Sequence, residues 1–327
     1  MTEGLRQLGE FGLISRLTGE LHPRGSLRLG IGDDCAEVEV GDTALLLTCD
    51  ASLEGVHFHR DWGTPEDLGW KAAVSALSDI AAMGGRANFL LVTLALPDDL
   101  DVSWVEGAYR GIRDAADFAG AQIVGGDTTA SRSGVVLDFS VVGEVVGRAV
   151  RRDGAKPGDL LAMTGGIGAR GAGLHALLHN VEAPELIAEY LRPFPRLVEG
   201  RWLQSQDAVH AMMDVSDGLL PDTRHIARSS GVGLHLYGDR LPAHAAVDRF
   251  WTDLGENSAE KRLRSGEEYE LLIAVERGEA AALRETFLHT FEVPLTFVGE
   301  CTDGHEGVMV DGKPAHDGGF EHFRPPR

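Results

Sequence analysis

Apolar runs and amphipathic segments alternate along the first half of the chain, which predicts a succession of strands and helices. The segment Glu66–Met83 is apolar on nearly all sides, as in a buried helix, and the pair Gly84-Gly85 ends it. Strand-length apolar runs lie on either side of this helix, and Pro97 stops the later one. The expected elements, in order, are strand Thr43–Cys49, helix Glu66–Met83, strand Phe89–Leu96, helix Val102–Ala119, short strand Gln122–Val124 and strand Val135–Val146.

The second half continues the alternation and predicts a separate α/β unit. The turn-rich stretch Asp153–Asp159 is the expected boundary between the two units. We therefore expect a mixed α+β chain of two domains, residues 1–150 and residues 151–327. The expected elements of the second domain are strand Leu160–Thr164, glycine-rich loop Gly165–Gly173 with a helical stretch after it, strand Val209–Met213, helix Pro221–Ser230 capped by Gly231, strand Glu270–Val275 and helix Ala280–His289.

The composition narrows the range of partners. The 327 residues carry 51 acidic and 30 basic side chains, a formal net charge of −21, without a basic run that could follow a nucleic-acid backbone. No apolar run has the length of a membrane span, and the N-terminal segment does not have the pattern of a signal peptide. The cysteines form no CxxC pair. We expect a cytoplasmic protein that binds neither nucleic acid nor a membrane.

Aspartates recur where apolar segments end, which is where ligands bind in α/β proteins. One such aspartate by itself is more often a helix cap or an Asx turn. Several of them together predict a shared site. The aspartates in this position are Asp33 and Asp34 after the GIG turn, Asp50 after Thr43–Cys49, Asp127 after the IVGG turn, and Asp214 with Asp217 after VHAMM.

Asp79 is a further carboxylate in an unusual setting, inside the apolar helix Glu66–Met83. It shares a helix face with Ala72 and Ala76, so its carboxylate needs a cation or hydrogen-bond donors. Carboxylates that converge repel one another by about 4 kcal/mol per pair at about 4 Å, which a divalent cation relieves. Oxygen ligands without a thiolate cluster or an HExxH pair favour magnesium.

A series of motifs resembles those of the thiamine-monophosphate kinase family, whose superfamily includes aminoimidazole-ribonucleotide synthetase and selenophosphate synthetase. The motifs occur in the family's order and span nearly the whole chain. They are GIGDD (Gly30–Asp34), TCDASLEGVHF (Thr48–Phe58), GWKAAVSALSDIAAMG (Gly69–Gly84), GGDTT (Gly125–Thr129), GRAVRRDGAKPGD (Gly147–Asp159), DVSDGL (Asp214–Leu219), GEEYELL (Gly266–Leu272) and GGFEHF (Gly318–Phe323).

The resemblance implies a two-domain aminoimidazole-ribonucleotide-synthetase-like fold whose N-terminal sheets pair across a homodimer. It also implies a kinase that uses ATP and several Mg2+ ions to phosphorylate thiamine monophosphate. The metal ligands that it implies are Asp34, Thr48, Cys49, Asp50, Asp79, Asp127, Asp214 and Asp217, with Asp33 a weaker candidate.

The same resemblance assigns the remaining roles. The catalytic carboxylates are expected to be Asp34, Asp50, Asp79, Asp127 and Asp214. The nucleotide contacts are expected to be Tyr109, Gly126, Asp127, Arg152 and Ser216, and the acceptor contacts His57, Glu267 and Phe320.

Two residues depart from the family pattern without arguing against the function. Cys49 stands where the family commonly has threonine, which is harmless if the backbone carbonyl is the ligand. Phe320 stands where the family often has tryptophan or tyrosine; it can stack on a flat ring but cannot donate a hydrogen bond.

The expected reaction is an in-line attack of a phosphate oxygen on the γ-phosphorus of ATP. A phosphate monoester has a second pKa of roughly 6, so no general base is required. The site must instead position two anions and neutralise their charge. Arg152 is the candidate cation for the phosphates, unless it is a solvated surface arginine beside Arg151.

Other interpretations stay open at this stage. The chain could be a sister ATP-dependent synthetase with another acceptor, or a nucleotide- or metal-binding protein without turnover. Gly165–Gly173 lacks the GK[ST] of a P-loop and is interpreted as a turn that opens a helix. His57 and His59 could be a fragment of a transition-metal site, but a lone HxH is more often a surface or substrate contact.

Overall fold

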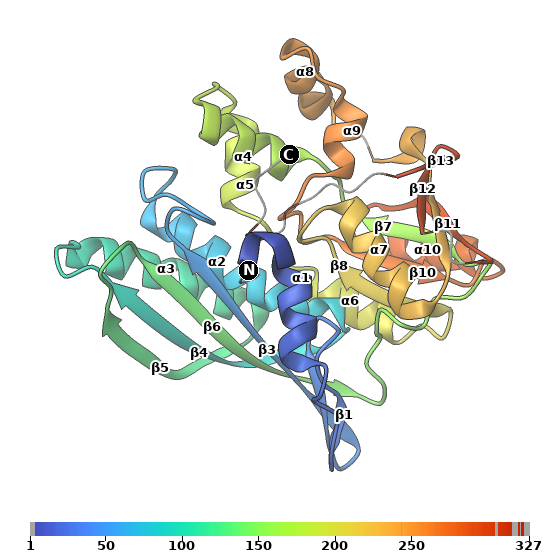
Figure 1. The fold of residues 1–327 in the computed structure, drawn as a ribbon, viewed down its shortest axis with the longest axis horizontal. Helices are drawn as coiled ribbons and strands as arrows, with labels where there is room; N and C mark the ends of the chain where they lie inside the picture. The colour runs from blue at the N-terminus through green and yellow to red at the C-terminus, as the bar shows by residue number, and fades with distance from the viewer. Residues whose placement is uncertain (1–3, 243, 305–306, 316–319, 321, 324–327) are drawn as a thin grey trace.

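The computed structural model describes residues 4–242, 244–304, 307–315, 320 and 322–323. Each half of the chain forms its own sheet with helices packed beside it (Figure 1). In this view the helix α1 (Leu5–Thr18) crosses the region between the two sheets. The mixed α+β, two-domain class is confirmed. The two sheets are joined by the loop that runs from residue 147 to residue 159. The expected boundary at residue 150 lies within this loop and stays a prediction.

The N-terminal sheet has six strands in the order β1-β2-β3-β6-β4-β5, and only β4 and β5 run parallel. Helices α2 and α3 pack against one face of this sheet, so the strands alternate between a buried and an exposed side. The strands and helices are β1 (Leu27–Leu29), β2 (Ala36–Val40), β3 (Thr43–Leu53), α2 (Pro65–Ala82), β4 (Arg86–Leu96), α3 (Val102–Ala119), β5 (Gln122–Ala130) and β6 (Val136–Val146).

Local sequence explains both the start of α2 and its close packing. Thr64 and Asp67 form a capping box, and Pro65 occupies the first turn, where its missing N–H costs nothing. A Cβ added at Gly69 would lie 1.9 Å from the carbonyl oxygen of Ala108 on α3. The two helices therefore approach to backbone contact, which fixes α2 against the sheet.

The C-terminal sheet has seven strands in the order β13-β12-β9-β11-β7-β10-β8. Helices α4, α5, α8 and α9 project away from this sheet (Figure 1). Its elements are β7 (Leu160–Thr164), α4 (Ala169–His179), α5 (Pro184–Leu191), α6 (Leu197–Gln204), β8 (Val209–Asp214), α7 (Leu219–Ser230), β9 (Gly233–Leu236), η1 (Gly238–Arg240), α8 (Ala245–Asp253), α9 (Ser258–Leu263), β10 (Leu271–Val275), α10 (Ala280–Thr290), β11 (Leu295–Thr302), β12 (Val308–Val310) and β13 (Lys313–Pro314).

Helix α2 is the central element of the molecule because it packs on both halves. It contacts β3, β4 and β6 of its own sheet and also β8, α5 and α6 of the other half. All the residues from Leu68 to Val74 are buried on it, including Lys71. The nearly all-round apolar pattern of this helix, read in the sequence as burial, is confirmed.

Three boundaries differ from the sequence prediction in a way that matters. β3 continues to Leu53 and β5 to Ala130, so Asp50 and Asp127 lie within strands and not beyond their ends. Cross-strand pairing with β6 and β4 extends both strands past the apolar runs that predicted them. α4 begins at Ala169, so the second half of the expected loop Gly165–Gly173 is helical. Its Gly173 lies against the Leu186 carbonyl of α5, where a Cβ would be 2.2 Å from the oxygen.

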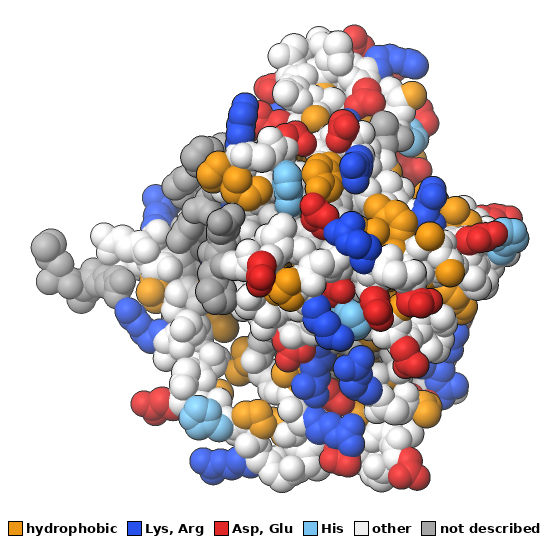
Figure 2. All heavy atoms as spheres, turned by 90° about the vertical axis from the view of Figure 1, so that its right-hand side faces the viewer, with side chains coloured by type: hydrophobic (Ala, Val, Ile, Leu, Met, Phe, Trp, Pro, Cys, Tyr) orange, Lys and Arg blue, Asp and Glu red, His pale blue; other side chains and the backbone are white. Residues whose placement is uncertain are grey.

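The surface and the helices add two observations. Charged side chains of both signs lie next to one another over the face shown in Figure 2, so the acidic surplus does not form one continuous patch there. None of the helices in the described part of the chain is long and apolar enough to cross a membrane.

Candidate functional site

Three of the expected carboxylates converge where the two halves meet. Carboxylate oxygens of Asp34, Asp79 and Asp214 all lie within 4.8 Å of one another. Asp34 comes from the loop before β2, Asp79 from α2, and Asp214 from the end of β8. Residues separated by most of the chain therefore supply one group of oxygen ligands. We call these three residues the carboxylate cluster.

Short hydrogen bonds orient the carboxylate cluster. The Thr48 hydroxyl donates to Asp79 Oδ2, and the Ser78 hydroxyl donates to Asp214 Oδ2 at 2.5 Å. Asp34 Oδ1 accepts from the Arg152 guanidinium. Asp34 Oδ2, in contrast, is buried and has no hydrogen-bond partner among the described residues. A buried carboxylate oxygen without a hydrogen-bond partner destabilises the fold unless a ligand binds to it.

The carboxylate cluster is electrostatically strained without a cation. Burial raises the pKa of Asp34 and of Asp214 to about 6 each, and it raises the pKa of Asp79 well above its usual range. The charges of Asp34 and Asp214 push the pKa of Asp79 further in the same direction, and Arg152 opposes the rise at Asp34. The three groups together form a site for a hard cation.

Asp33 has a supporting position. Its carboxylate accepts hydrogen bonds from the backbone N–H groups of Asp34 and Arg152, at 3.0 and 3.1 Å, and it pairs with the Arg152 guanidinium at 3.2 Å. Burial raises the pKa of Asp33 to about 7. Asp33, which the sequence indicated as a weaker metal-ligand candidate than Asp34, therefore fixes the positions of the loop and of the Arg152 side chain relative to each other.

Asp50 and Asp127 lie far apart in the N-terminal sheet. Asp50 pairs with Phe139 on β6, which pairs with Val92 on β4, which pairs with Gly126 on β5. Adjacent strands are about 4.8 Å apart, so three steps separate Asp50 from this end of β5 by roughly 14 Å. Asp50 is near enough to the carboxylate cluster to raise the pKa of Asp79 and Asp214, whereas Asp127 is exposed on the edge strand.

Gly126 and Tyr109 also lie outside the carboxylate cluster. A Cβ added at Gly126 would lie 1.8 Å from the Val92 carbonyl oxygen, so glycine is required there by strand packing alone. Tyr109 is exposed on α3, beside a shallow hollow of about 470 Å³ that also includes Val102 and Arg113. The structure does not bring these two expected nucleotide contacts together with the carboxylate cluster within one chain.

Cys49 and Thr48 point to opposite faces of the sheet, as neighbours on a strand do. Thr48 reaches Asp79 on the buried face, while the exposed Cys49 thiol lies 3.4 Å from Asp138 Oδ1 on the outer face. A contact of Cys49 with a metal in the carboxylate cluster would therefore have to use its backbone oxygen.

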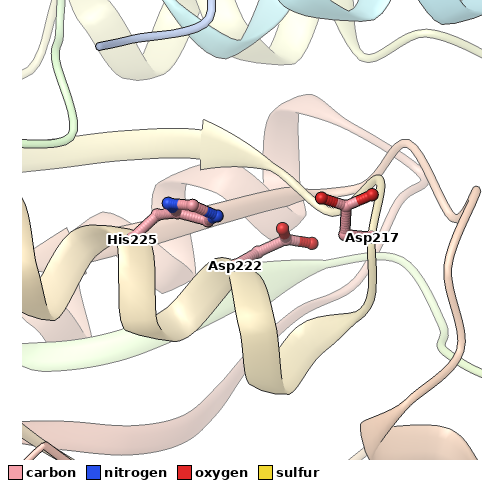
Figure 3. Close-up of side chains that lie close together, drawn as sticks. All are labelled: Asp217, Asp222 and His225. Atoms are coloured by element: carbon pink, nitrogen blue, oxygen red, sulfur yellow. The ribbon is translucent and has the colours of Figure 1, made fainter. Parts of the chain in front are cut away.

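A second group of side chains lies just beyond β8. Asp217, Asp222 and His225 have potential ligand atoms within 4.8 Å of one another (Figure 3). Asp222 Oδ2 accepts the backbone N–H groups of Ser216 and Gly218, both at 3.1 Å, so Asp222 fixes the loop that carries Asp217. Asp222 and His225 were not predicted from the sequence, although their spacing of three places both on one face of α7.

The environment of His225 keeps its ring neutral. Burial, together with the charges of Arg152 and Arg228, lowers the pKa of His225 to about 4. Its ring packs against Phe11 of α1 at 5.0 Å between centroids. α1 therefore lies beside the loop of Asp217, a contact that the sequence did not indicate.

The expected acceptor residues lie close to one another. The His57 ring is 6.5 Å from the Phe320 ring and 5.4 Å from the His322 ring. Glu267 is close enough to His57 for its charge to raise the pKa of that ring, against the stronger lowering by burial. These residues come from the loop after β3, the loop before β10 and the C-terminal segment.

Backbone hydrogen bonds join the acceptor residues to the loop after β8. The Glu267 N–H donates to the Ser216 carbonyl at 2.6 Å, and the Phe320 N–H donates to the Asp217 carbonyl at 3.2 Å. The carboxylate cluster and the acceptor residues are thus connected through Ser216 and Asp217. Ser216 itself is half-buried, next to the cluster in sequence.

Comparison with known proteins gives one consistent result. The model of the AIR synthase related protein N-terminal domain matches residues 32–145, and that of the C-terminal domain matches residues 156–312. Thiamine-monophosphate kinase of Aquifex aeolicus (strain VF5) is 37% identical over 98% of this chain and 99% of its own length. Its counterpart in Escherichia coli (strain K12) is 35% identical over 97% and 99%.

A solved structure agrees with the sequence comparison. AaThiL complexed with AMPPCP and TMP superposes with a TM-score of 0.89 at 36% identity, covering 98% of this chain and 99% of that one. The match covers both sheets and the region in which the carboxylate cluster lies.

Proposed function

Because the chain belongs to the thiamine-monophosphate kinase family of AIR synthase related proteins, we propose that it transfers the γ-phosphoryl group of ATP to thiamine monophosphate. The products are thiamine diphosphate and ADP. The similar structure with AMPPCP and TMP supports both substrates. A cytoplasmic location is consistent with this role and stays a prediction.

The observation that carries the proposal is the connection between the carboxylate cluster and the acceptor residues. A phosphoryl transfer from the phosphoanhydride of ATP to a phosphate monoester needs a site for charge neutralisation next to a site for the acceptor's rings. Ser216 and Asp217 belong to one loop that follows the cluster residue Asp214 and hydrogen-bonds to Glu267 and Phe320. One short loop thus links the two sites that the reaction requires.

The donor set fits magnesium. The carboxylate cluster offers oxygen ligands only, and the buried Asp34 Oδ2 has no hydrogen-bond partner in the part of the chain that the structure describes. Asp34, Asp79 and Asp214 would hold the ion, with Asp50 and Asp217 close enough to act electrostatically on Asp214. When bound, magnesium neutralises the negative charge of the phosphates that must approach each other.

The chain's own residues then orient the reactants for in-line attack. The acceptor phosphate is already ionised near neutral pH, so it needs no general base. Arg152 lies beside Asp34, so a phosphate oxygen near Asp34 comes within reach of the same guanidinium. His57 and Phe320 offer ring faces to the flat rings of the acceptor, while Glu267 offers a negative charge to its thiazolium.

We further propose a homodimer through the exposed face of the N-terminal sheet. Leu47, Val142 and Phe89 lie in one row across β3, β6 and β4, and Leu47 and Phe89 are exposed by 39% and 43%. A face of this kind favours association. A second copy on it would also give Asp127 a carboxylate cluster to join, which the distance within one chain does not allow.

A product assay tests the reaction. Purified protein is incubated with ATP, magnesium and thiamine monophosphate, and thiamine diphosphate is quantified by chromatography, with free thiamine as the control acceptor. We expect magnesium-dependent product from the monophosphate and none from thiamine. Bound ATP without product would instead favour a sister synthetase or a protein that only binds nucleotide.

A further inference from the structure

Lys71 is a buried lysine on α2 that contacts the loop carrying Glu267. Its side chain is 6% exposed, and its Nζ forms an ion pair with Glu267 Oε1 across the two halves of the molecule. The same Nζ lies 4.5 Å from the centre of the Tyr190 ring. A buried ammonium group needs such partners, and all of them come from the C-terminal half.

The loop that Lys71 contacts has an unusual backbone. Glu267 has a φ of 57°, in the left-handed region that residues with a Cβ rarely adopt. Strained positions of this kind persist where the surroundings determine them and are concentrated at ligand sites. The Lys71 ion pair and the hydrogen bond from the Glu267 N–H to the Ser216 carbonyl are two of the contacts that hold this residue.

Tyr190 links Lys71 to the other acceptor residue. Its hydroxyl donates to the His57 carbonyl at 3.0 Å, and the Leu53 N–H donates to His57 Nδ1 at 3.0 Å. The neutral ring therefore carries its proton on Nε2. Lys71 thus lies between Glu267, which it pairs with, and Tyr190, which supports His57.

We propose that Lys71 is a positioning residue for the acceptor, which holds the Glu267 carboxylate in place beside the His57 ring. The inference rests on the proposed function. A lysine cannot itself attract the thiazolium cation of thiamine monophosphate, but an ionised carboxylate can, and the amino group of the pyrimidine is a further donor for it. Lys71 therefore acts through Glu267 on the binding of the acceptor and not on that of ATP.

The substitution Lys71→Met tests this role because it keeps the length and the apolar contact with Tyr190 while it removes the charge. We expect the KM for thiamine monophosphate to rise at least about tenfold, with the KM for ATP changed by less than about twofold. Lys71→Arg, which restores a cation, should recover part of the loss. In a Glu267→Gln background, Lys71→Met should add little, because the group that it positions is already changed.

Arg192→Met is the matched control. Arg192 pairs with Asp67 at 2.5 Å and lies 5.3 Å from the Trp70 ring, so it also joins α2 to the C-terminal half, but through these two residues and not through Lys71. We expect this variant to keep the wild-type KM for thiamine monophosphate. If both variants lose thermal stability and change both KM values equally, Lys71 is merely structural and the inference is overturned.

The outcomes separate the inference from the function on which it rests. A wild-type protein that makes no thiamine diphosphate contradicts the proposed function itself. A wild-type protein that makes it, together with a Lys71→Met variant of unchanged KM for thiamine monophosphate, contradicts only the role of Lys71. Should Lys71→Met fail to fold, Lys71→Gln is measured in its place by the same comparison.

Discussion

Ser78 Oγ donates a hydrogen bond of 2.5 Å to Asp214 Oδ2, although the two residues are 136 positions apart in the chain. Both are buried, with exposures of 0% and 1%. The bond joins α2 of the N-terminal half to the end of β8 in the C-terminal half. The orientation of a cluster carboxylate is therefore set by a serine from the other half of the molecule.

Replacement of Ser78 by alanine should weaken both the fold and magnesium binding. The loss of a hydrogen bond to a buried carboxylate costs about 2 kcal/mol, because Asp214 then keeps its desolvation without this donor. Thermal unfolding and a magnesium titration measure the two effects. Ser75→Ala is the control, since the Ser75 hydroxyl donates to the Ala72 carbonyl of its own helix and to no other described residue; an equal effect of both changes would contradict the special role of Ser78.

Asp79→Asn should abolish turnover while the fold is retained. Burial raises the pKa of Asp79 well above its ordinary value, so the ionised carboxylate lowers the free energy of unfolding of the metal-free protein. An amide of the same shape removes this destabilisation. The measurements are the product assay and the circular dichroism spectrum of the variant. Normal turnover would remove Asp79 from the site.

The contribution of Asp34 and Asp214 to the stability of the metal-free protein should fall as the pH rises from about 4 to about 7, opposite in sign to that of His225, whose folded pKa is about 4. Asp34 and Asp214 have an ordinary pKa of 3.8 and a folded pKa of about 6, so the folded state binds more protons than the unfolded state in this window. Stability falls with pH wherever the folded state binds more protons. The reversible unfolding temperature, measured in the presence of a chelator, checks the sign.

Magnesium should reverse this trend, since it competes with protons for the same oxygens. The rise in unfolding temperature on adding magnesium is expected to be larger at pH 7.5 than at pH 5.5. In Asp34→Asn the dependence should be weaker. A magnesium effect that is independent of pH would mean that the ion binds elsewhere.

Mixed dimers test whether two copies share a site. Asp50→Asn and Asp127→Asn should each be inactive alone, because each removes a carboxylate from every site. If Asp50 of one copy works with Asp127 of another, mixing the variants restores about one quarter of the wild-type activity, since half of the dimers are mixed and each keeps one of two sites. No recovery after confirmed exchange of subunits would place both residues in one chain's site.

The helices and strands that the sequence predicted well are those with strong periodicity and clear ends. Val102–Ala119 and Leu160–Thr164 have the predicted bounds, and Gly231 caps α7 in the left-handed conformation. Helix α1 and the short strands β1, β2, β9, β12 and β13 were not predicted, since short or weakly amphipathic segments take their structure from what they pack against.

The site shows the same division between local and tertiary information. Motifs and strand-end aspartates singled out Asp34, Asp79 and Asp214 from the sequence, and the structure brings these three together. The same reasoning grouped Asp127 with them, although the sheet order keeps it away within one chain. The sequence did not indicate a role for Asp222, His225 or Lys71, because each of these residues contacts a partner that is remote in sequence or a backbone N–H group.

The sequence by itself determined the strongly periodic elements, the chemistry of the ligands and the family, because apolar periodicity and residue type are local properties of the chain. Only the tertiary structure decided which carboxylates meet, which strand face Cys49 occupies and which loop the Lys71 ammonium contacts. Strand order, register and the packing of α2 on both halves are set by non-local burial. Those contacts turn a series of separated motifs into one site.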